Sequence, residues 1–217
     1  MLSLVIFDCD GVLFDSADAN IAYYNAVLER LGQPPLDVEW SRRAHFLSSH
    51  QLYEAMFGIG SALGAEARRV GREVDYGPYF KLMRPSAELS RVLHTLRAHY
   101  RLAMATNRSS TVPGVMREFG LDRFFELAVG SHDVARPKPH PDMLHKCLDH
   151  FGIEASAALY VGDSESDHHA AQAAGMHFLA VGDIAPGAHR IGALRELPSW
   201  LATAQPSMII PPSTGIT

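Results

Sequence analysis

Five short apolar segments stand out along the chain, at residues 2–7, 102–106, 127–130, 159–162 and 178–181. Polar or glycine residues follow each of them, and helical patterns fit between them, at about 86–98, 109–119, 140–151 and 166–174. Continuous apolar strands that alternate with helices are typical of a parallel sheet covered on both faces. The pattern therefore predicts an α/β fold with a doubly wound, Rossmann-like parallel sheet.

The connection between the first two predicted strands is too long for a simple crossover. Roughly 95 residues separate Asp8 from Leu102, whereas about 10–30 residues usually suffice. Within this stretch Ile21, Tyr24 and Leu28 recur at helical intervals. We therefore expect an α/β core at residues 1–16 and 84–205, interrupted by a helical cap at residues 17–83. Residues 206–217 are rich in Pro, Ser and Thr, which predicts a disordered tail.

Composition narrows the classes of protein that need to be considered. The 217 residues are 47% hydrophobic and 20% charged, with a net charge of -5, as in globular proteins. The chain has no basic patch of the kind that binds nucleic acid, and no apolar run reaches the ~18 residues that a membrane helix needs. The N-terminus lacks the features of a signal peptide. Cys9 and Cys147 are far apart, so we expect a reducing cytoplasm. The sequence does not indicate an oligomeric state.

Polar side chains follow several of the predicted strands, where each strand ends. Asp8 and Asp10 follow the first strand at a spacing that places both on one face of an extended backbone. Thr106 and Asn107 follow the second strand, and Asp163 follows the fourth. Ligands of open parallel sheets bind beyond the carboxyl ends of the strands, so we expect these side chains to share one crevice.

Each of these groups also has a purely structural explanation. Asp8 and Asp10 could close a polar turn, Thr106 could cap the following helix, and Ser164 with Asp167 resembles a capping box. Lys138, which lies between two prolines, could be an exposed loop residue. Taken together, however, the groups supply carboxylates for a hard cation, and a hydroxyl and an ammonium for a phosphate.

The same residues resemble the four motifs of the haloacid dehalogenase-like superfamily. The run Asp8-Cys9-Asp10-Gly11-Val12-Leu13-Phe14-Asp15-Ser16 is similar to motif one, Thr106-Asn107 to motif two, Lys138 to motif three, and Gly162-Asp163-Ser164 with Asp167 to motif four. The resemblance covers residues 1–16 and 84–185. The insertion after motif one is similar to the helical C1-type cap of the phosphoglycolate phosphatase and β-phosphoglucomutase branch. The resemblance implies the strand order 5-4-1-2-3.

This resemblance implies a phosphatase in which Asp8 is the nucleophile. Asp8 would form an aspartyl-phosphate, and Asp10 would serve as the general acid and base. A Mg²⁺ ion would be bound by Asp8, Asp163 and the backbone carbonyl of Asp10.

The remaining motif residues would hold the phosphate. Thr106, Asn107 and Lys138 would contact its non-transferred oxygens, and Asp167 would orient Lys138 or the metal shell. The substrate would be a small phosphorylated metabolite that the cap selects.

Two positions depart from the family pattern, and they leave the substrate open. Val12 stands where many family phosphatases have threonine, and residues 45–49 lack a glycine expected of phosphoglycolate phosphatases. A sugar phosphomutase is the alternative, although Asn20 stands where β-phosphoglucomutase has a histidine.

Two further classes fit the sequence less well. A phospho-Asp receiver domain is about half as long and has no cap, and an inactive binding protein would not need every expected catalytic side chain. Basic residues in the cap could contact an anionic substrate, although a solvated surface explains each of them as well; they are Arg42, Arg43, His45 and His50.

Overall fold

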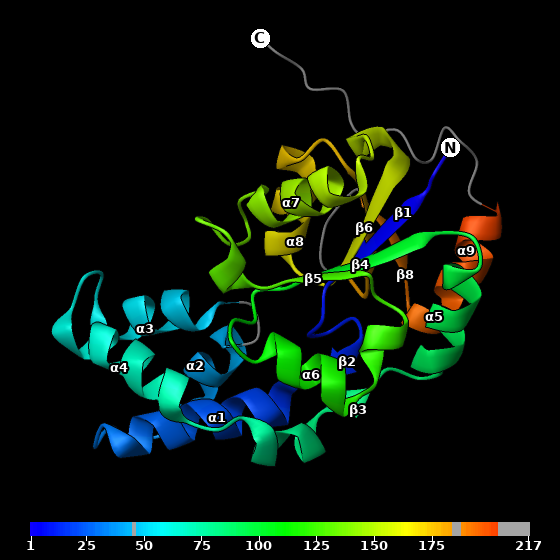
Figure 1. Cartoon of the computed structure of the whole chain (residues 1–217). Coiled ribbons are helices and arrows are strands. Elements are labelled where there is room, and N and C mark those ends of the chain that lie inside the picture. The colour runs from blue at the N-terminus through cyan, green and yellow to red at the C-terminus, as the bar shows by residue number, and fades with distance from the viewer. Residues whose placement is uncertain (45–46, 184–187, 204–217) are drawn as a thin grey trace, which may run out of the picture.

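The computed structural model describes residues 1–44, 47–183 and 188–203. Its centre is a six-stranded sheet in the order β5-β4-β1-β6-β7-β8, in which all neighbouring strands are parallel (Figure 1). The strands are β1 (Leu4–Phe7), β4 (Arg101–Ala105), β5 (Leu127–Val129), β6 (Ala158–Gly162), β7 (His177–Val181) and β8 (His189–Ile191). The doubly wound α/β fold is confirmed, and the five predicted strands lie in the expected order.

Helices cover both faces of this sheet. Along β1, Leu4 and Ile6 pack into a hydrophobic cluster with α7 (Asp142–Phe151) and α8 (Glu165–Ala173). Val5 and Phe7 pack into a second cluster with α5 (Leu89–Arg97), α6 (Val112–Glu118) and α9 (Leu197–Thr203). Successive side chains of a strand point to opposite faces. An apolar residue is therefore needed at every position of β1, and this explains its continuous hydrophobic run.

A group of helices, here called the helical insertion, lies between β2 (Phe14–Asp15) and β3 (Arg84–Pro85). These two strands pair antiparallel beside the main sheet. The insertion comprises α1 (Ala17–Arg30), α2 (Val38–Arg43), α3 (Ser49–Phe57), α4 (Ala62–Glu73) and the 3₁₀ helix η1 (Gly77–Leu82).

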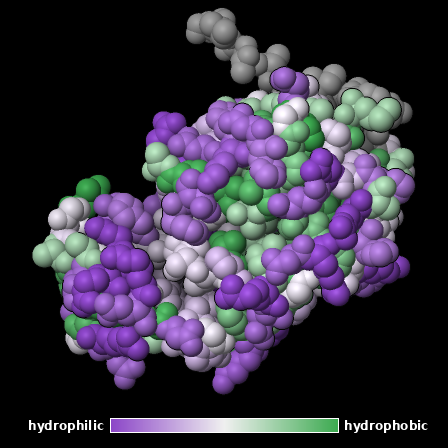
Figure 2. All heavy atoms as spheres, in the orientation of Figure 1, coloured by the Kyte–Doolittle hydropathy of each residue, from purple (hydrophilic) through white to green (hydrophobic). Residues whose placement is uncertain are grey.

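The helical insertion packs around its own hydrophobic cluster, which includes Val27, Leu52 and Val70. Figure 2 shows it as a smaller lobe beside the core, with mainly hydrophilic residues on the face in view. The division of the chain into domains at residues 17 and 83 stays a prediction. The predicted tail at residues 206–217 lies outside the described residues. No helix that the structure describes is long and apolar enough to cross a membrane.

The remaining short helices are η2 (Leu121–Arg123), η3 (Ser131–Asp133), η4 (Ala155–Ala157) and η5 (Leu194–Glu196). The helix predicted from residue 109 begins at Val112, where Pro113 suits the first turn. The helix predicted from residue 86 begins at Leu89, because Glu88 is left-handed, with φ of 62°. The edge strand β8 was not predicted, since its three residues include exposed His189 and Arg190.

The cluster under α5 provides a test of the core. Leu93 is fully buried there, so Leu93→Ala should lower the free energy of unfolding by about 2–5 kcal/mol, through lost apolar burial and a residual cavity. Urea denaturation of the two proteins measures this difference. Val38→Ala, at an exposed position in α2, is the control and should change stability by less than about 0.5 kcal/mol. Equal effects of the two substitutions would contradict the assigned packing.

Candidate active site

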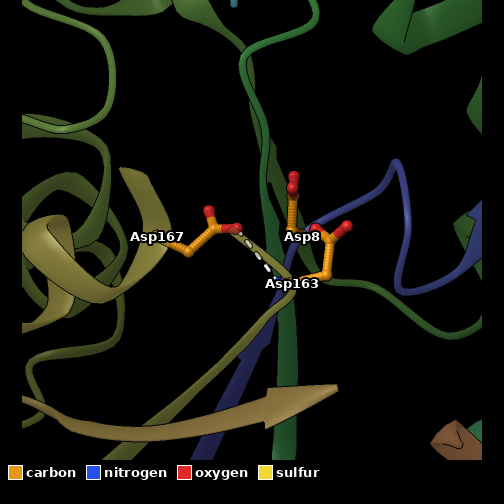
Figure 3. Close-up of side chains that lie close together, drawn as sticks. All are labelled: Asp8, Asp163 and Asp167. Carbon is orange, nitrogen blue, oxygen red and sulfur yellow. Dashed lines mark hydrogen bonds between the residues drawn. The ribbon is translucent and has the colours of Figure 1, made fainter. Parts of the chain in front are cut away.

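The carboxyl end of β1 brings Asp8 and Asp163 together. Asp8 directly follows β1, and its backbone N–H donates to Val161 in β6 at 2.9 Å. Asp163 directly follows β6, and Figure 3 shows its carboxylate beside that of Asp8. Gly11 allows this approach, because its φ is 81° and a Cβ there would lie 1.8 Å from Asp163 Oδ2. Glycine is therefore required in the segment that follows Asp8.

The ammonium of Lys138 is buried against Asp8. Its Nζ lies 2.9 Å from Asp8 Oδ1 and 2.6 Å from Asp167 Oδ1. It also donates to the Tyr160 hydroxyl at 2.9 Å and to the Ala105 carbonyl at 3.3 Å. Burial alone would lower the pKa of Lys138, but Asp167 and Asp8 outweigh it and raise this pKa. Lys138 therefore remains a cation inside the protein.

Asp167 is held in place on every side. Its Oδ2 accepts from the Ser164 hydroxyl at 2.6 Å and from the backbone N–H groups of Ser164 and Asp163. These contacts include the predicted capping box at the start of α8. Its Oδ1 accepts from Lys138 and from Tyr160 at 2.8 Å. Burial would raise the pKa of Asp167, but Lys138 outweighs this effect and lowers it. Asp167 is thus an ionised partner that fixes Lys138.

The charge balance around Asp8 and Asp163 favours a cation. Burial, with repulsion from neighbouring carboxylates, raises the pKa of Asp8 to about 7 and that of Asp163 to about 8. Carboxylate oxygens of Asp8, Asp163 and Asp167 lie within 4.8 Å of one another. Because Asp167 is already engaged, Asp8 and Asp163 are the side chains left to bind a metal. Hard oxygen donors with excess negative charge fit Mg²⁺.

Thr106 and Asn107 lie in the loop after β4, next to Lys138. Asn107 Nδ2 donates to the Lys138 carbonyl at 3.2 Å, and Asn107 Oδ1 is buried without a partner among the described residues. Thr106 Oγ1 accepts from the backbone N–H of Arg108 at 3.2 Å. Because α6 begins only at Val112, Thr106 does not cap it. Both residues line a cavity of about 50 Å³ together with Asp8, Asp10, Lys138 and Asp163.

Arg108, whose role the sequence pattern does not indicate, binds Asp10. Arg108 is buried, and its Nη2 and Nε lie 2.7 and 3.1 Å from Asp10 Oδ1. The Ser16 hydroxyl donates to the same oxygen. Burial would lower the pKa of Arg108, but Asp10 outweighs it and raises this pKa. The sequence feature that could have indicated this contact is the position of Arg108, which directly follows Thr106-Asn107.

Tyr160 is a second site residue that the sequence pattern does not indicate. It lies in the apolar strand β6, and its hydroxyl accepts from Lys138, donates to Asp167 and lies 3.0 Å from the Ala105 carbonyl oxygen. A single phenol within a hydrophobic run gives no sequence signal that separates this polar role from ordinary packing.

The helical insertion closes the other side of the site. Asn20 Oδ1 accepts from the Tyr76 hydroxyl at 2.7 Å and from Arg108 at 3.1 Å. Gln51 Nε2 donates to the Lys138 carbonyl at 3.3 Å. Asn20 also lines the 50 Å³ cavity, so an amide that cannot titrate occupies this wall.

Of the basic residues considered in the cap, Arg42 and Arg43 are exposed and do not line this cavity. His50 lines a neighbouring cavity. His45 lies outside the described residues.

The sequence pattern of the haloacid dehalogenase-like hydrolases matches residues 5–181. The chain belongs to this family. It is 29% identical to the phosphoglycolate phosphatase of Aliivibrio fischeri, over 83% of this chain and 84% of that protein. It is 30% identical to the phosphoglycolate phosphatase of Vibrio parahaemolyticus, over 80% and 81% of the two chains. These findings confirm the predictions of family and of a phosphatase.

Solved structures agree with the fold. A subfamily IA hydrolase of the haloacid dehalogenase superfamily from Geobacter sulfurreducens is 37% identical, with a TM-score of 0.73 over 92% of this chain and 96% of that chain. CbbY from Rhodobacter sphaeroides, solved in complex with phosphate, is 22% identical, with a TM-score of 0.79 over 91% and 96%. The second similarity supports the fold alone.

The raised pKa values of Asp8 and Asp163 predict how Mg²⁺ affects stability. Between about pH 4 and pH 8 the unfolded chain has lost protons that these folded carboxyls retain, so the metal-free protein loses stability as pH rises. Protons and a Mg²⁺ ion held by Asp8 and Asp163 would compete for the same oxygens. Mg²⁺ should therefore raise the melting temperature more at about pH 8 than at about pH 5.5.

Thermal melts with and without MgCl₂ at the two pH values measure this difference. Asp163→Asn should abolish the Mg²⁺ effect, whereas Asp122→Asn, at an exposed position, should leave it unchanged. An equal Mg²⁺ shift at both pH values would count against the assigned ligands.

Arg108 generates a separate prediction. Arg108→Gln should lower kcat by about 10- to 100-fold, as when a side chain that orients another active-site group is removed. Arg108→Lys should restore little of the lost activity. An ammonium lacks the planar guanidinium group through which Arg108 makes two hydrogen bonds to Asp10. Steady-state assays measure both variants against Arg91→Gln, an exposed control. Wild-type kcat in Arg108→Gln would show that Asp10 does not need this partner.

Proposed function

We propose that this protein is a magnesium-dependent phosphatase that hydrolyses a small phosphate monoester through an aspartyl-phosphate on Asp8. The observation that carries the proposal is the meeting of Asp8, Lys138 and Asp163 at one small cavity. A carboxylate beside a buried ammonium and a second carboxylate is suited to phosphoryl transfer, in which positioning and charge stabilisation dominate.

The two oxygens of Asp8 have different surroundings. Oδ1 accepts from the backbone N–H of Cys9 at 2.7 Å and contacts Lys138. Oδ2 accepts no hydrogen bond from the residues that the structure describes. We therefore assign Oδ2 as the atom that attacks phosphorus, while Oδ1 holds the carboxylate in position.

The charge of the transferred group requires several partners. When bound by Asp8, Asp163 and the backbone carbonyl of Asp10, Mg²⁺ would offset the repulsion between carboxylate and phosphate. The Thr106 hydroxyl, the Asn107 amide and the Lys138 ammonium would hold the non-transferred oxygens, where negative charge accumulates.

Asp10 serves both half-reactions in this proposal. It would donate a proton to the leaving alkoxide and later accept a proton from the water that hydrolyses the aspartyl-phosphate. Arg108 and Ser16 hold Asp10 Oδ1, so Oδ2 is the oxygen left to exchange the proton.

The size of the cavity supports a compact substrate. About 50 Å³ lies between the core and the walls formed by Tyr24, Ala44 and Leu47 of the insertion, which is room for a phosphoryl group and a short alcohol. The phosphoglycolate phosphatases of Aliivibrio fischeri and Vibrio parahaemolyticus suggest phosphoglycolate as the first ester to assay. We also propose a cytoplasmic location, with which the free buried thiols of Cys9 and Cys147 agree.

Asp8→Asn tests the nucleophile. Turnover of p-nitrophenyl phosphate and of a panel of small phosphomonoesters should depend on Mg²⁺ and fall by about 10³-fold or more in the variant, because an amide oxygen is a far weaker nucleophile. Rapid acid quenching with a radiolabelled ester should trap label on the wild type alone. Asp122→Asn is the matched control.

Two results would overturn the proposal. One is wild-type turnover by Asp8→Asn. The other is a folded wild type that binds Mg²⁺ and hydrolyses no ester.

A further inference from the structure

The hydroxyl of Tyr160 has two alternative hydrogen-bond acceptors. It lies 2.8 Å from Asp167 Oδ1 and 3.0 Å from the Ala105 carbonyl oxygen, and the whole side chain is fully buried. A phenol carries a single proton, so it serves one of these oxygens at a time. The other oxygen then depends on a different donor, and Lys138 is the side chain that reaches both.

The ammonium of Lys138 has more acceptors within reach than it has protons. Its Nζ lies 2.6 Å from Asp167 Oδ1, 2.9 Å from Asp8 Oδ1 and 2.9 Å from the Tyr160 hydroxyl. The Ala105 carbonyl oxygen, at 3.3 Å, is a fourth acceptor. An ammonium has three N–H protons. Every proton of Lys138 therefore already has an acceptor inside the protein.

A bound phosphate would compete with these acceptors. Lys138 and Asp8 line the 50 Å³ cavity, whereas Tyr160 and Ala105 do not. To donate to a phosphate oxygen in that cavity, the ammonium has to release one of its present partners. Hydrogen bonds between two charged groups are roughly twice as strong as neutral ones. The neutral oxygens of Tyr160 and Ala105 should therefore be released before the carboxylates of Asp8 and Asp167.

The released carbonyl of Ala105 needs a new donor. Ala105 is fully buried, and a buried carbonyl without a partner costs free energy. Among the side chains that the structure describes, Lys138 and Tyr160 donate to it. The phenol proton can turn from Asp167 to Ala105, because Asp167 keeps its contacts with Lys138 and Ser164. No buried polar group is then left unpaired.

We propose that Tyr160 is a positioning residue for the phosphate, whose hydroxyl replaces Lys138 at the Ala105 carbonyl when Lys138 turns an N–H group to the substrate. This inference rests on the proposed phosphatase function and adds to it a residue that does not touch the substrate. Phenylalanine at this position would keep the ring and remove the replacement donor. The Ala105 carbonyl would then retain the proton of Lys138 that the phosphate needs.

Tyr160→Phe tests the inference through phosphate binding. Isothermal titration of inorganic phosphate in the presence of MgCl₂ should show a Kd about 3- to 10-fold higher than in the wild type, the effect of about one hydrogen bond. The KM of p-nitrophenyl phosphate should rise with it, because the contact forms when the ester binds. Tyr100→Phe is the matched control. Tyr100 is half-buried beside His99, so its substitution should change neither value.

A spectroscopic measurement follows Lys138 directly. The chain has three lysines, and Lys81 and Lys146 are exposed. Exposed ammonium protons exchange rapidly with water, so in protein labelled with ¹⁵N-lysine the buried Lys138 should give the resolved ammonium signal. Saturating inorganic phosphate should shift this signal in the wild type and shift it less in Tyr160→Phe. A role of Tyr160 in packing alone would lower the melting temperature and leave the response to phosphate unchanged.

Several outcomes would refute this role of Tyr160. They are equal phosphate Kd values for the wild type and Tyr160→Phe, equal losses in Tyr160→Phe and Tyr100→Phe, and an equal response of the Lys138 signal in the wild type and Tyr160→Phe. A signal that does not shift in the phosphate-saturated wild type would refute it without any variant. Each of these results in an enzyme that hydrolyses esters leaves the proposed function standing. A folded wild type that hydrolyses no ester would instead refute the proposed function.

Discussion

The buried ammonium of Lys138 is the constraint on which the site depends. A charge enclosed in protein is tolerated only when it is paired and hydrogen-bonded, and Asp8, Asp167 and Tyr160 meet that requirement. These partners come from the end of β1, the start of α8 and the middle of β6. The pairing of β4, β1 and β6 at the centre of the sheet brings them to one point. Packing of the sheet and placement of these buried charges are therefore parts of one structural solution.

The helical insertion is tied to this centre through polar contacts. Gln51 binds the backbone of Lys138, and Asn20 with Tyr76 binds the guanidinium that holds Asp10. In the proposed mechanism, groups that would select a ligand are thus connected to groups that would act on its phosphate.

The sequence predicts most of this arrangement for identifiable physical reasons. Strands buried on both faces must be apolar throughout, so β1 and β6 are evident as hydrophobic runs, whereas the edge strand β8 includes exposed polar residues and is not. Side chains that follow adjacent parallel strands must converge, so the neighbourhood of Asp8, Thr106 and Asp163 was predictable. The contact of Arg108 with Asp10 joins residues 98 positions apart. It depends on the course of the loop after β4, because α6 starts later than its pattern indicated.

The pairing of β2 with β3 has an evolutionary consequence. Phe14 lies opposite Pro85 and Asp15 opposite Arg84, so the chain leaves the core and returns to it through two adjacent strands. A module anchored in this way can be lengthened, shortened or exchanged while the spacing of its two attachment points stays constant. Selection for a new ester can therefore act on the helices between β2 and β3 and leave Asp8, Lys138 and Asp163 in place. One catalytic centre can in this way serve a lineage of enzymes that differ in what they recognise.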